Sequence, residues 1–142
     1  MLDGDESCEC FYPFAEAGGA YSGSVTAFAS EDAPGSTFKV AVISLAAQDL
    51  RPDRPYPTSP TFEYAVLFQN LRSLFHIALV HGHTRLVLGA IGCGAFRNPP
   101  EEVARAYATL LSTEFQGCFE NVVFAVSRSP RNLEAFKTAL LV

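Results

Sequence analysis

The hydrophobic pattern of residues 37–142 alternates between short apolar runs and longer amphipathic segments. Three runs rich in β-branched residues predict strands over residues 37–47, 85–92 and 121–127. Three segments with apolar residues at helical spacing predict helices over residues 61–81, 99–115 and 129–142. Because strands and helices alternate, the pattern predicts an α/β protein with a mostly parallel or mixed sheet and helices on its faces.

Finer features of the pattern predict a core and the ends of some elements. The first predicted strand has the continuous apolar character of a strand buried on both faces of a parallel sheet. The apolar stripes of the first two helices predict these core residues: Leu67, Leu71, Leu74, Phe75, Ala78, Leu79, Val103, Tyr107, Leu110 and Leu111. Gly82 predicts the end of the first helix, and Ser129 followed by Pro130 predicts a capped start of the last one.

The composition of the 142-residue chain limits its class of function. The length fits one domain over residues 1–142, with a loop-rich segment at 1–36 and an α/β core at 37–142. The net charge of −5 argues against a nucleic-acid-binding protein, because neutralising phosphates needs clustered Lys and Arg. No signal peptide and no apolar run of membrane-spanning length is visible, so we expect a soluble, cytoplasmic or otherwise intracellular protein without membrane association.

The most informative segment is the glycine-rich turn GAIGCGAFRNPPEEVA at residues 89–104. It follows a predicted strand, and ligands of open α/β sheets collect at the carboxyl ends of strands. Gly92 and Gly94 are able to adopt positive φ on either side of Cys93, so consecutive N–H groups can converge on one anion. The pattern favours a phosphate or diphosphate site, with a simple strand-to-helix corner as the alternative.

The residues after the glycines place such a site on the loop rather than on the helix terminus. Asn98 predicts an N-cap, and Glu101 completes an Asn-x-x-Glu capping box. Pro99 and Pro100 have no N–H and the first turn is acidic, so the helix terminus is a poor anion site. The order G-x-x-G-x-G differs from the Rossmann fingerprint, and the Gly-Lys-Ser/Thr of a Walker A motif is absent.

Two aromatic residues are candidates for contacts with a nucleotide. Phe96, in the middle of the turn, is expected to pack against a ribose or base, with burial under the loop as the alternative. Tyr21, in the segment GGAYSG, is a candidate for stacking on an adenine, and packing against the sheet edge is the alternative.

The histidines and cysteines predict neither a metal centre nor a nucleophile. His76, His81 and His83 surround the end of the first predicted helix, where imidazolium groups complement the helix dipole. Cys93 has no histidine identified beside it, so we interpret it as a small residue that allows close approach of a ligand. Cys8 and Cys10 lack a second Cys/His pair at finger-like spacing, and we expect no metal and no cofactor.

Three segments together resemble the bacterial-type poly(ADP-ribose) glycohydrolases, relatives of the macrodomains: VAVISLAAQDLRP, ALVHGHTRLVLGAIGCGAFRNPPEEVARAYATLL and FENVVFAVS. The similarity also reaches FYPFAEAGGAYSGSVTAF and so covers most of the chain. It implies a three-layer α/β/α, macrodomain-like sandwich, truncated at its N-terminal side, that binds ADP-ribose or an ADP-ribosylated protein. It further implies that the turn is a diphosphate-binding loop, with Phe96 against a ribose. The expected ligand-binding residues are Gly92, Cys93, Gly94, Ala95, Phe96, Asn98 and Tyr21.

The sequence departs from this family in its catalytic segment, a glycine-rich loop that ends in tandem glutamates. Glu101 and Glu102 follow the phosphate loop and lie in a different element, whereas Glu6, Glu9 and Glu16 lack the family's glycines. We therefore assign no catalytic residue. Because glycoside cleavage needs a carboxyl group, the sequence predicts ADP-ribose binding with weak or absent hydrolysis.

Two further functions stay open at this stage. In one, the chain is an active ADP-ribose glycohydrolase whose acidic loop comes from a complementing partner chain, from a homo-oligomer or from an upstream region. In the other, it is a non-enzymatic interaction protein whose glycine-rich turn is only a corner.

Overall fold

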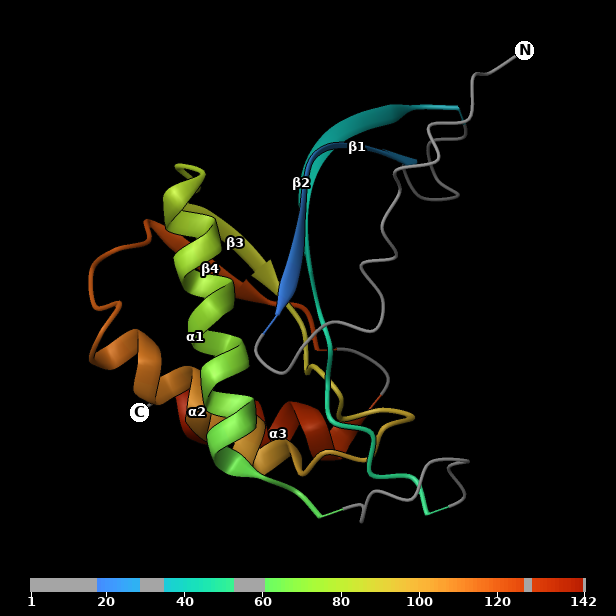
Figure 1. Cartoon of the computed structure of the whole chain (residues 1–142), viewed down its shortest axis with the longest axis vertical. Coiled ribbons are helices and arrows are strands. Elements are labelled where there is room, and N and C mark those ends of the chain that lie inside the picture. The colour runs from blue at the N-terminus through green and yellow to red at the C-terminus, as the bar shows by residue number, and fades with distance from the viewer. Residues whose placement is uncertain (1–17, 29–34, 53–60, 127–128, 142) are drawn as a thin grey trace.

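The computed structural model describes residues 18–28, 35–52, 61–126 and 129–141. Within these ranges the elements are β1 (Gly19–Phe28), β2 (Thr37–Leu45), α1 (Tyr64–Val80), β3 (Arg85–Leu88), α2 (Pro100–Ser112), β4 (Asn121–Phe124) and α3 (Pro130–Leu140). Figure 1 shows β1 and β2 as a long pair beside α1, with α2 and α3 gathered below β3 and β4. The α/β class predicted from the sequence is confirmed.

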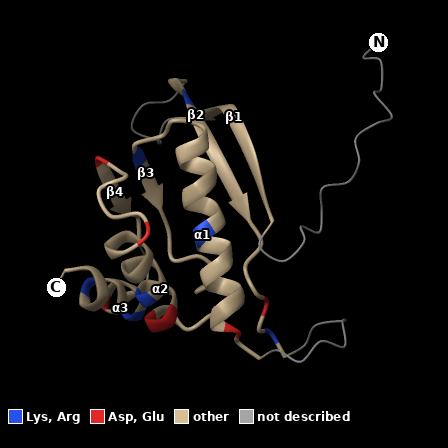
Figure 2. Cartoon of the chain, turned by 60° about the vertical axis from the view of Figure 1, so that its left-hand side comes forward, with Lys and Arg blue, Asp and Glu red and all other residues tan. Residues whose placement is uncertain are grey.

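The strands form two separate two-stranded sheets in the described part of the chain. β1 and β2 are antiparallel, whereas β3 and β4 are parallel. Figure 2 shows α1 in front, with β1 and β2 to its right and β3 and β4 to its left in that view. The expected three-layer sandwich with one mostly parallel sheet is therefore not confirmed.

Strand β2 corrects one prediction about burial. The sequence predicts a strand buried on both faces of a parallel sheet, but β2 pairs antiparallel with β1, and Val40 and Val42 are exposed by 39% and 36%. An apolar β-branched run specifies a strand without specifying the direction of its partner or whether both faces are covered. The prediction of buried faces is wrong for this reason.

Strand β1 lies within the segment predicted to be loop-rich and extends over ten residues. Its sequence, GAYSGSVTAF, is dominated by small and polar residues, so the strand signal is confined to residues 24–28. Pairing with β2 on both sides of an irregularity between Ser22 and Val25 supplies the missing stabilisation. Residues 1–17 and 29–34, which belong to the same predicted segment, lie outside the described residues.

The core lies between the three helices and one face of β3 and β4. All ten residues of the predicted stripes belong to it or pack against it, with Leu79 and Leu111 only partly buried. The ring of Tyr107 in α2 contacts Phe75 of α1 and Phe124 of β4, with centroids 6.1 and 5.1 Å apart. On the opposite face of the sheet, Val87 and Val123 are exposed by 75% and 50%.

Two helix boundaries lie where the sequence predicts them, the end of α1 and the start of α3. The N–H groups of Gly82 and His83 donate to the carbonyls of Leu79 and Ala78, and Gly82 has a φ of 72°, which is a Schellman motif. The Ser129 hydroxyl accepts the N–H of Asn132 and caps α3. None of the helices in the described ranges is long and apolar enough to cross a membrane.

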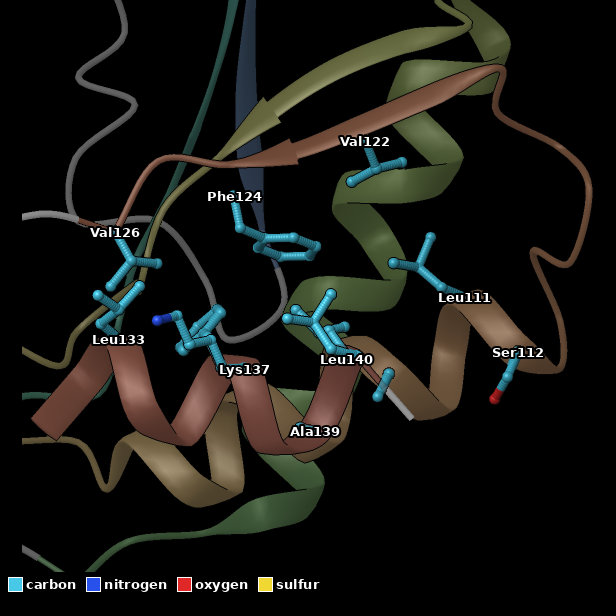
Figure 3. A pocket seen from close by; sticks show the side chains of 12 residues that line it. Leu111, Ser112, Val122, Phe124, Val126, Leu133, Lys137, Ala139 and Leu140 are labelled. Atoms are coloured by element: carbon cyan, nitrogen blue, oxygen red, sulfur yellow. The ribbon is translucent and has the colours of Figure 1, made fainter.

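A pocket of about 720 Å³ lies between β4, α2 and α3. Figure 3 shows Phe124 pointing from β4 toward α3 across this space. Apart from Ser112 and Lys137 its lining is apolar, and it includes no residue of the glycine-rich turn. A polyanionic ligand needs several hydrogen-bond donors, so this pocket is a poor match for the diphosphate predicted from the sequence.

Candidate ligand-binding site

The glycine-rich loop, residues 89–98, leads from the carboxyl end of β3 to α2. The Cys93 N–H donates to the Ala90 carbonyl at 3.1 Å, and the Asn98 N–H donates to the Gly92 carbonyl at 3.0 Å. These internal bonds fold the loop on itself before α2 begins. The Cys93 N–H is therefore engaged within the loop, so a ligand at this loop would be held by its other amides.

Among the other amides of residues 92–96, those of residues 94–96 are consecutive. Within the described part of the chain, the N–H groups of Gly94, Ala95 and Phe96 donate no hydrogen bond, and all three residues are exposed. Successive unengaged backbone donors on an exposed loop are the elements of an anion-binding nest. The candidate phosphate cradle is thus shorter than the predicted one and starts at Gly94.

The two glycines of the loop have different roles. Gly92 has a φ of 70°, and a Cβ there would lie 2.5 Å from Nδ2 of Asn98 and 3.0 Å from Cβ of Ala47. Gly94 does not adopt the positive φ that the sequence allows, whereas Arg97 has the left-handed conformation, with a φ of 60°. A Cβ at Gly94 would meet nothing within 4 Å. Gly92 shapes the loop, whereas Gly94 borders open space.

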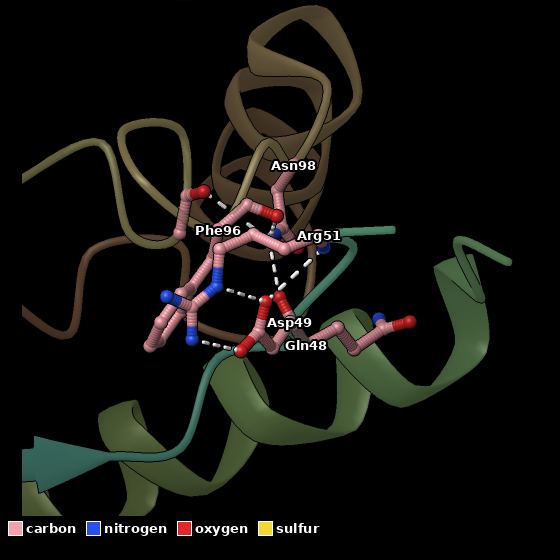
Figure 4. A network of polar contacts seen from close by, with 6 residues as sticks. Gln48, Asp49, Arg51, Phe96 and Asn98 are labelled. Atoms are coloured by element: carbon pink, nitrogen blue, oxygen red, sulfur yellow. Dashed lines mark hydrogen bonds and ion pairs between the residues drawn. The ribbon is translucent and has the colours of Figure 1, made fainter. Parts of the chain in front are cut away.

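Asn98 does not cap α2. The N-cap is Pro99, without a side-chain hydrogen bond, so the predicted capping box is wrong. Asn98 is 3% exposed, and its Nδ2 donates to the carbonyls of Gln48 at 2.6 Å and Gly92 at 3.2 Å. Figure 4 shows this amide between the loop and the chain that follows β2. An asparagine side chain can cap a helix or hydrogen-bond a distant segment of the chain, and the sequence does not distinguish these two roles.

The segment after β2 contributes two residues that sequence reasoning missed, Asp49 and Arg51. The Leu50 N–H donates to the Phe96 carbonyl at 3.0 Å, which brings this segment against the loop. Arg51 donates through Nε and Nη2 to the two carboxylate oxygens of Asp49, at 2.9 and 2.6 Å. Its guanidinium carbon lies 5.2 Å from the centroid of the Phe96 ring (Figure 4). The proline-rich context of Arg51 gave no local signal for this contact.

Phe96 is 36% exposed, so its ring is only partly covered by Arg51 and the loop. The alternative that it fills the core beneath the loop is not supported at this exposure. An aromatic face, a cation and consecutive backbone donors therefore lie together at the carboxyl end of β3. This combination can hold a phosphate group next to a flat or sugar-like group.

Tyr21 lies elsewhere. Its ring stacks on His81 with centroids 3.5 Å apart, and its hydroxyl hydrogen-bonds Nε2 of His83 at 2.8 Å. Both histidines precede β3, whereas the glycine-rich loop follows it, so the structure does not bring Tyr21 to the loop. Its stacking on an adenine stays a prediction.

The histidines do not gather into one cluster. His76 contacts Glu114 at 3.0 Å, apart from the pair that holds Tyr21. Among the described residues no group of three or more His, Cys, Asp or Glu side chains could hold a metal ion. Cys8 and Cys10 lie outside the described residues.

Cys93 is half-buried below the exposed part of the loop, and its Sγ donates to the Ile91 carbonyl at 3.5 Å. Burial, with a smaller contribution from the Glu101 charge, raises the pKa of the thiol to about 11. The thiol form therefore predominates at neutral pH, which agrees with the interpretation that Cys93 is not a nucleophile.

The glutamates after the loop are engaged in ion pairs. Glu101 contacts Arg131 at 3.3 Å, and Glu102 pairs with Arg105. The backbone N–H of Glu101, together with Arg131, lowers the pKa of this carboxyl. Glu101 is thus held ionised at the start of α2, and both glutamates are engaged with arginines. Glu6, Glu9 and Glu16 lie outside the described residues.

No protein-family model and no curated protein matches the chain. Solved structures do match. Poly(ADP-ribose) glycohydrolase from Deinococcus radiodurans in complex with ADP-ribose is 34% identical, with a TM-score of 0.71, over 84% of this chain and 50% of that one. Its apo form gives 35% identity and a TM-score of 0.73, over 84% and 51%. The enzyme from Thermomonospora curvata is 34% identical, with a TM-score of 0.69, over 84% of this chain and 46% of that one. The chain spans about half the length of these proteins, and the resemblance seen in the sequence is confirmed.

Proposed function

The chain is related to the bacterial-type poly(ADP-ribose) glycohydrolases, and we propose that it binds ADP-ribose or a related nucleotide diphosphate at the loop that follows β3. One observation carries the proposal: Gly94, Ala95 and Phe96 present consecutive N–H groups that donate no hydrogen bond within the described fold. The D. radiodurans relative in complex with ADP-ribose supports the class of ligand.

Each group of the site has a defined part in this proposal. The amides of residues 94–96 donate to the oxygens of the diphosphate, and the open space at Gly94 admits the phosphate close to the backbone. The exposed part of the Phe96 ring packs against a ribose, while Arg51, paired with Asp49, covers part of the ring. Gly92 and Asn98 hold the shape of the loop from which these amides donate.

We propose that the chain hydrolyses ADP-ribosyl bonds poorly by itself. The acidic groups next to the loop are committed to cations, Asp49 to Arg51 and Glu101 to Arg131. A carboxyl group engaged with a cation in this way is not available to protonate a leaving group. An active glycohydrolase completed by an acidic group from another polypeptide is the second candidate, favoured by the relation to enzymes. A non-enzymatic role on protein surfaces is the third.

Isothermal titration of the chain with ADP-ribose tests binding. We expect ADP-ribose to give saturable heat. ADP should give it too and adenosine should not, because the amides of residues 94–96 bind the diphosphate. Gly94→Glu should abolish the heat by filling the nest with a negative charge, and the matched Gly94→Ala variant should weaken it, since a Cβ there meets no protein atom but takes up space that the phosphate needs. If no heat is seen at about 1 mM ADP-ribose, a dissociation constant below about 1 mM, or about 4 kcal/mol of binding free energy, is excluded. That result would refute the proposal.

Hydrolysis needs a separate assay, the release of ADP-ribose from poly(ADP-ribose) or from modified protein. We expect the chain alone to release it at least about 1,000-fold more slowly than the T. curvata enzyme, because a missing general acid costs several orders of magnitude. Release at a comparable rate would show that a carboxyl group of this chain is catalytic after all.

A further inference from the structure

Strands β2 and β3 run side by side without pairing. The segments that follow them are joined by hydrogen bonds, from the Leu50 N–H to the Phe96 carbonyl and from the Asn98 side chain to the Gln48 carbonyl. Since their carboxyl ends meet, the two strands point in the same direction, as Figures 1 and 2 also show. Yet β2 pairs only with β1, and β3 only with β4, among the described residues. Each therefore has an open edge toward the other.

The space between these edges is a pocket of about 240 Å³. Its lining comes from both strands and from α1: Val40, Ala41, Ile43, Leu74, His83, Arg85, Leu86, Val87 and Leu88. On the face of the strands away from the core, apolar side chains are exposed on both sides of the space, including Val40, Val42 and Val87. Open edges and exposed valines are features that soluble proteins normally cover.

We propose that this gap is a docking site for one extended strand of a partner polypeptide, which joins the two sheets into one. An extended segment is the occupant that offers N–H and C=O groups along both of its sides, as two facing open edges require. Because the lining is mainly apolar, the inserted strand should carry apolar side chains at every second position, on the face that points into the gap. Lys39 and Arg85, the charged residues of β2 and β3, are both basic and both near the amino ends of their strands. Within the described part of the chain Lys39 donates only to the Thr26 hydroxyl, whereas Arg85 contacts Glu120, so an acidic residue fits best beside Lys39.

A second copy of the chain is a poor occupant. Every strand in the described ranges already pairs along one edge and has one edge left, whereas the inserted strand must bond on both sides. The occupant is thus a strand that is unpaired before it binds. Docking at this gap does not depend on ADP-ribose, so this inference and the proposed function can fail separately.

The solved relatives are about twice as long as the region that this chain matches, and their unmatched part serves as a probe. We would co-express the full chain with the part of the T. curvata enzyme outside the match, purify the complex and measure hydrogen–deuterium exchange. We expect the amides of β2 and of β3 to exchange at least about 10-fold more slowly than in the free chain, since both edges become hydrogen-bonded. Failure to form a complex, or protection confined to one strand or to the pocket between β4 and α3, would overturn the proposal.

Paired variants locate the contact. Val40→Glu and Val87→Glu place a charge at the gap, whereas Val25→Glu and Val123→Glu change the residues directly opposite them on β1 and β4, which do not line it. We expect at least about 10-fold weaker complex formation for the first two and less than about threefold for the others. Val87 is 75% exposed, so this variant should fold even if Val40→Glu does not. If Val25→Glu weakened the complex as much as Val40→Glu, and Val123→Glu as much as Val87→Glu, docking at this gap would be contradicted.

Discussion

At the scale of single residues, Gly92 is fixed by two separate constraints. Its positive φ is costly for any residue with a Cβ, and the space that a Cβ would need is filled by the Asn98 amide and Ala47. Gly94 has neither constraint, although the two glycines look equivalent in the sequence GCG. A glycine that is needed for shape and a glycine that leaves room for a ligand can therefore be separated by experiment.

The substitution Gly92→Ala should lower the free energy of unfolding by about 2 to 4 kcal/mol, from the strained φ and the overlap with Asn98. The matched Gly94→Ala substitution should change it by less than about 0.5 kcal/mol. Urea denaturation followed by circular dichroism measures both. Equal losses for the two variants would show that Gly94 is as constrained as Gly92.

The raised pKa of Cys93 predicts slow chemical modification. With a pKa of about 11, roughly one thiol in a thousand is ionised at pH 8, and the thiolate is the reactive form. Iodoacetamide should therefore label Cys93 at least about 10-fold more slowly than the exposed Cys118, and faster as the pH rises from 8 to 10. Peptide mass spectrometry separates the two sites, and unfolding in urea should abolish the difference. Rapid labelling of Cys93 in the folded chain would favour a reactive thiol.

At the scale of elements, the loop after β3 depends on the segment after β2. Asn98 joins the two segments through its side chain, and the bond between the Leu50 N–H and the Phe96 carbonyl adds a second tie. The orientation of the Phe96 ring is thus set by residues about fifty positions earlier in the chain. A contact of this kind has no periodicity or spacing that sequence reasoning could have detected.

Replacing Asn98 by Ser distinguishes a tie from a cap. Ser is as good an N-cap as Asn, so a capping role predicts a change of less than about 0.5 kcal/mol. A Ser hydroxyl is too short to reach the Gln48 carbonyl, so the tie predicts that Asn98→Ser and Asn98→Ala each cost about 2 to 3 kcal/mol. Ser129→Ala, at the genuine cap of α3, should cost about 1 kcal/mol and serves as the reference in urea denaturation. A mild effect of Asn98→Ser would restore the capping role.

Elements with strong local signals were predictable, and long-range pairings were not. The buried stripe of α1, its Gly82 terminus and the Ser129 cap follow from spacing and residue type alone. β1 is a strand only because β2 lies beside it, and the antiparallel direction of that pair left no trace in the apolar run. The glycine-rich loop was located correctly, but which of its amides stay unengaged is decided by three-dimensional hydrogen bonding.

At the scale of the whole molecule, two sheets that do not pair share one set of helices. α1 packs against β1 and β2 and also against α2, and Leu74 lines the space between β2 and β3. The core residues of α1 belong to the same cluster as Leu86 and Leu88 of β3. We therefore propose that residues 18–141 behave as one domain, although their backbone hydrogen bonds form two groups.

Cooperative unfolding tests this proposal. If α1 couples the sheets, hydrogen exchange at increasing urea should give the same midpoint for peptides from β1–β2 and from β3–β4, because neither pair is stable without the shared core. Leu74→Ala should lower both midpoints together and cost about 2 to 4 kcal/mol, since Leu74 is buried in α1 and lines the space between the two sheets. Leu133→Ala, which removes a 40% exposed side chain from α3, should leave both nearly unchanged and serves as the control. A lower midpoint for β1–β2 alone would mean that this pair is a separate unit, and the occupant of the gap would then have to supply the coupling itself.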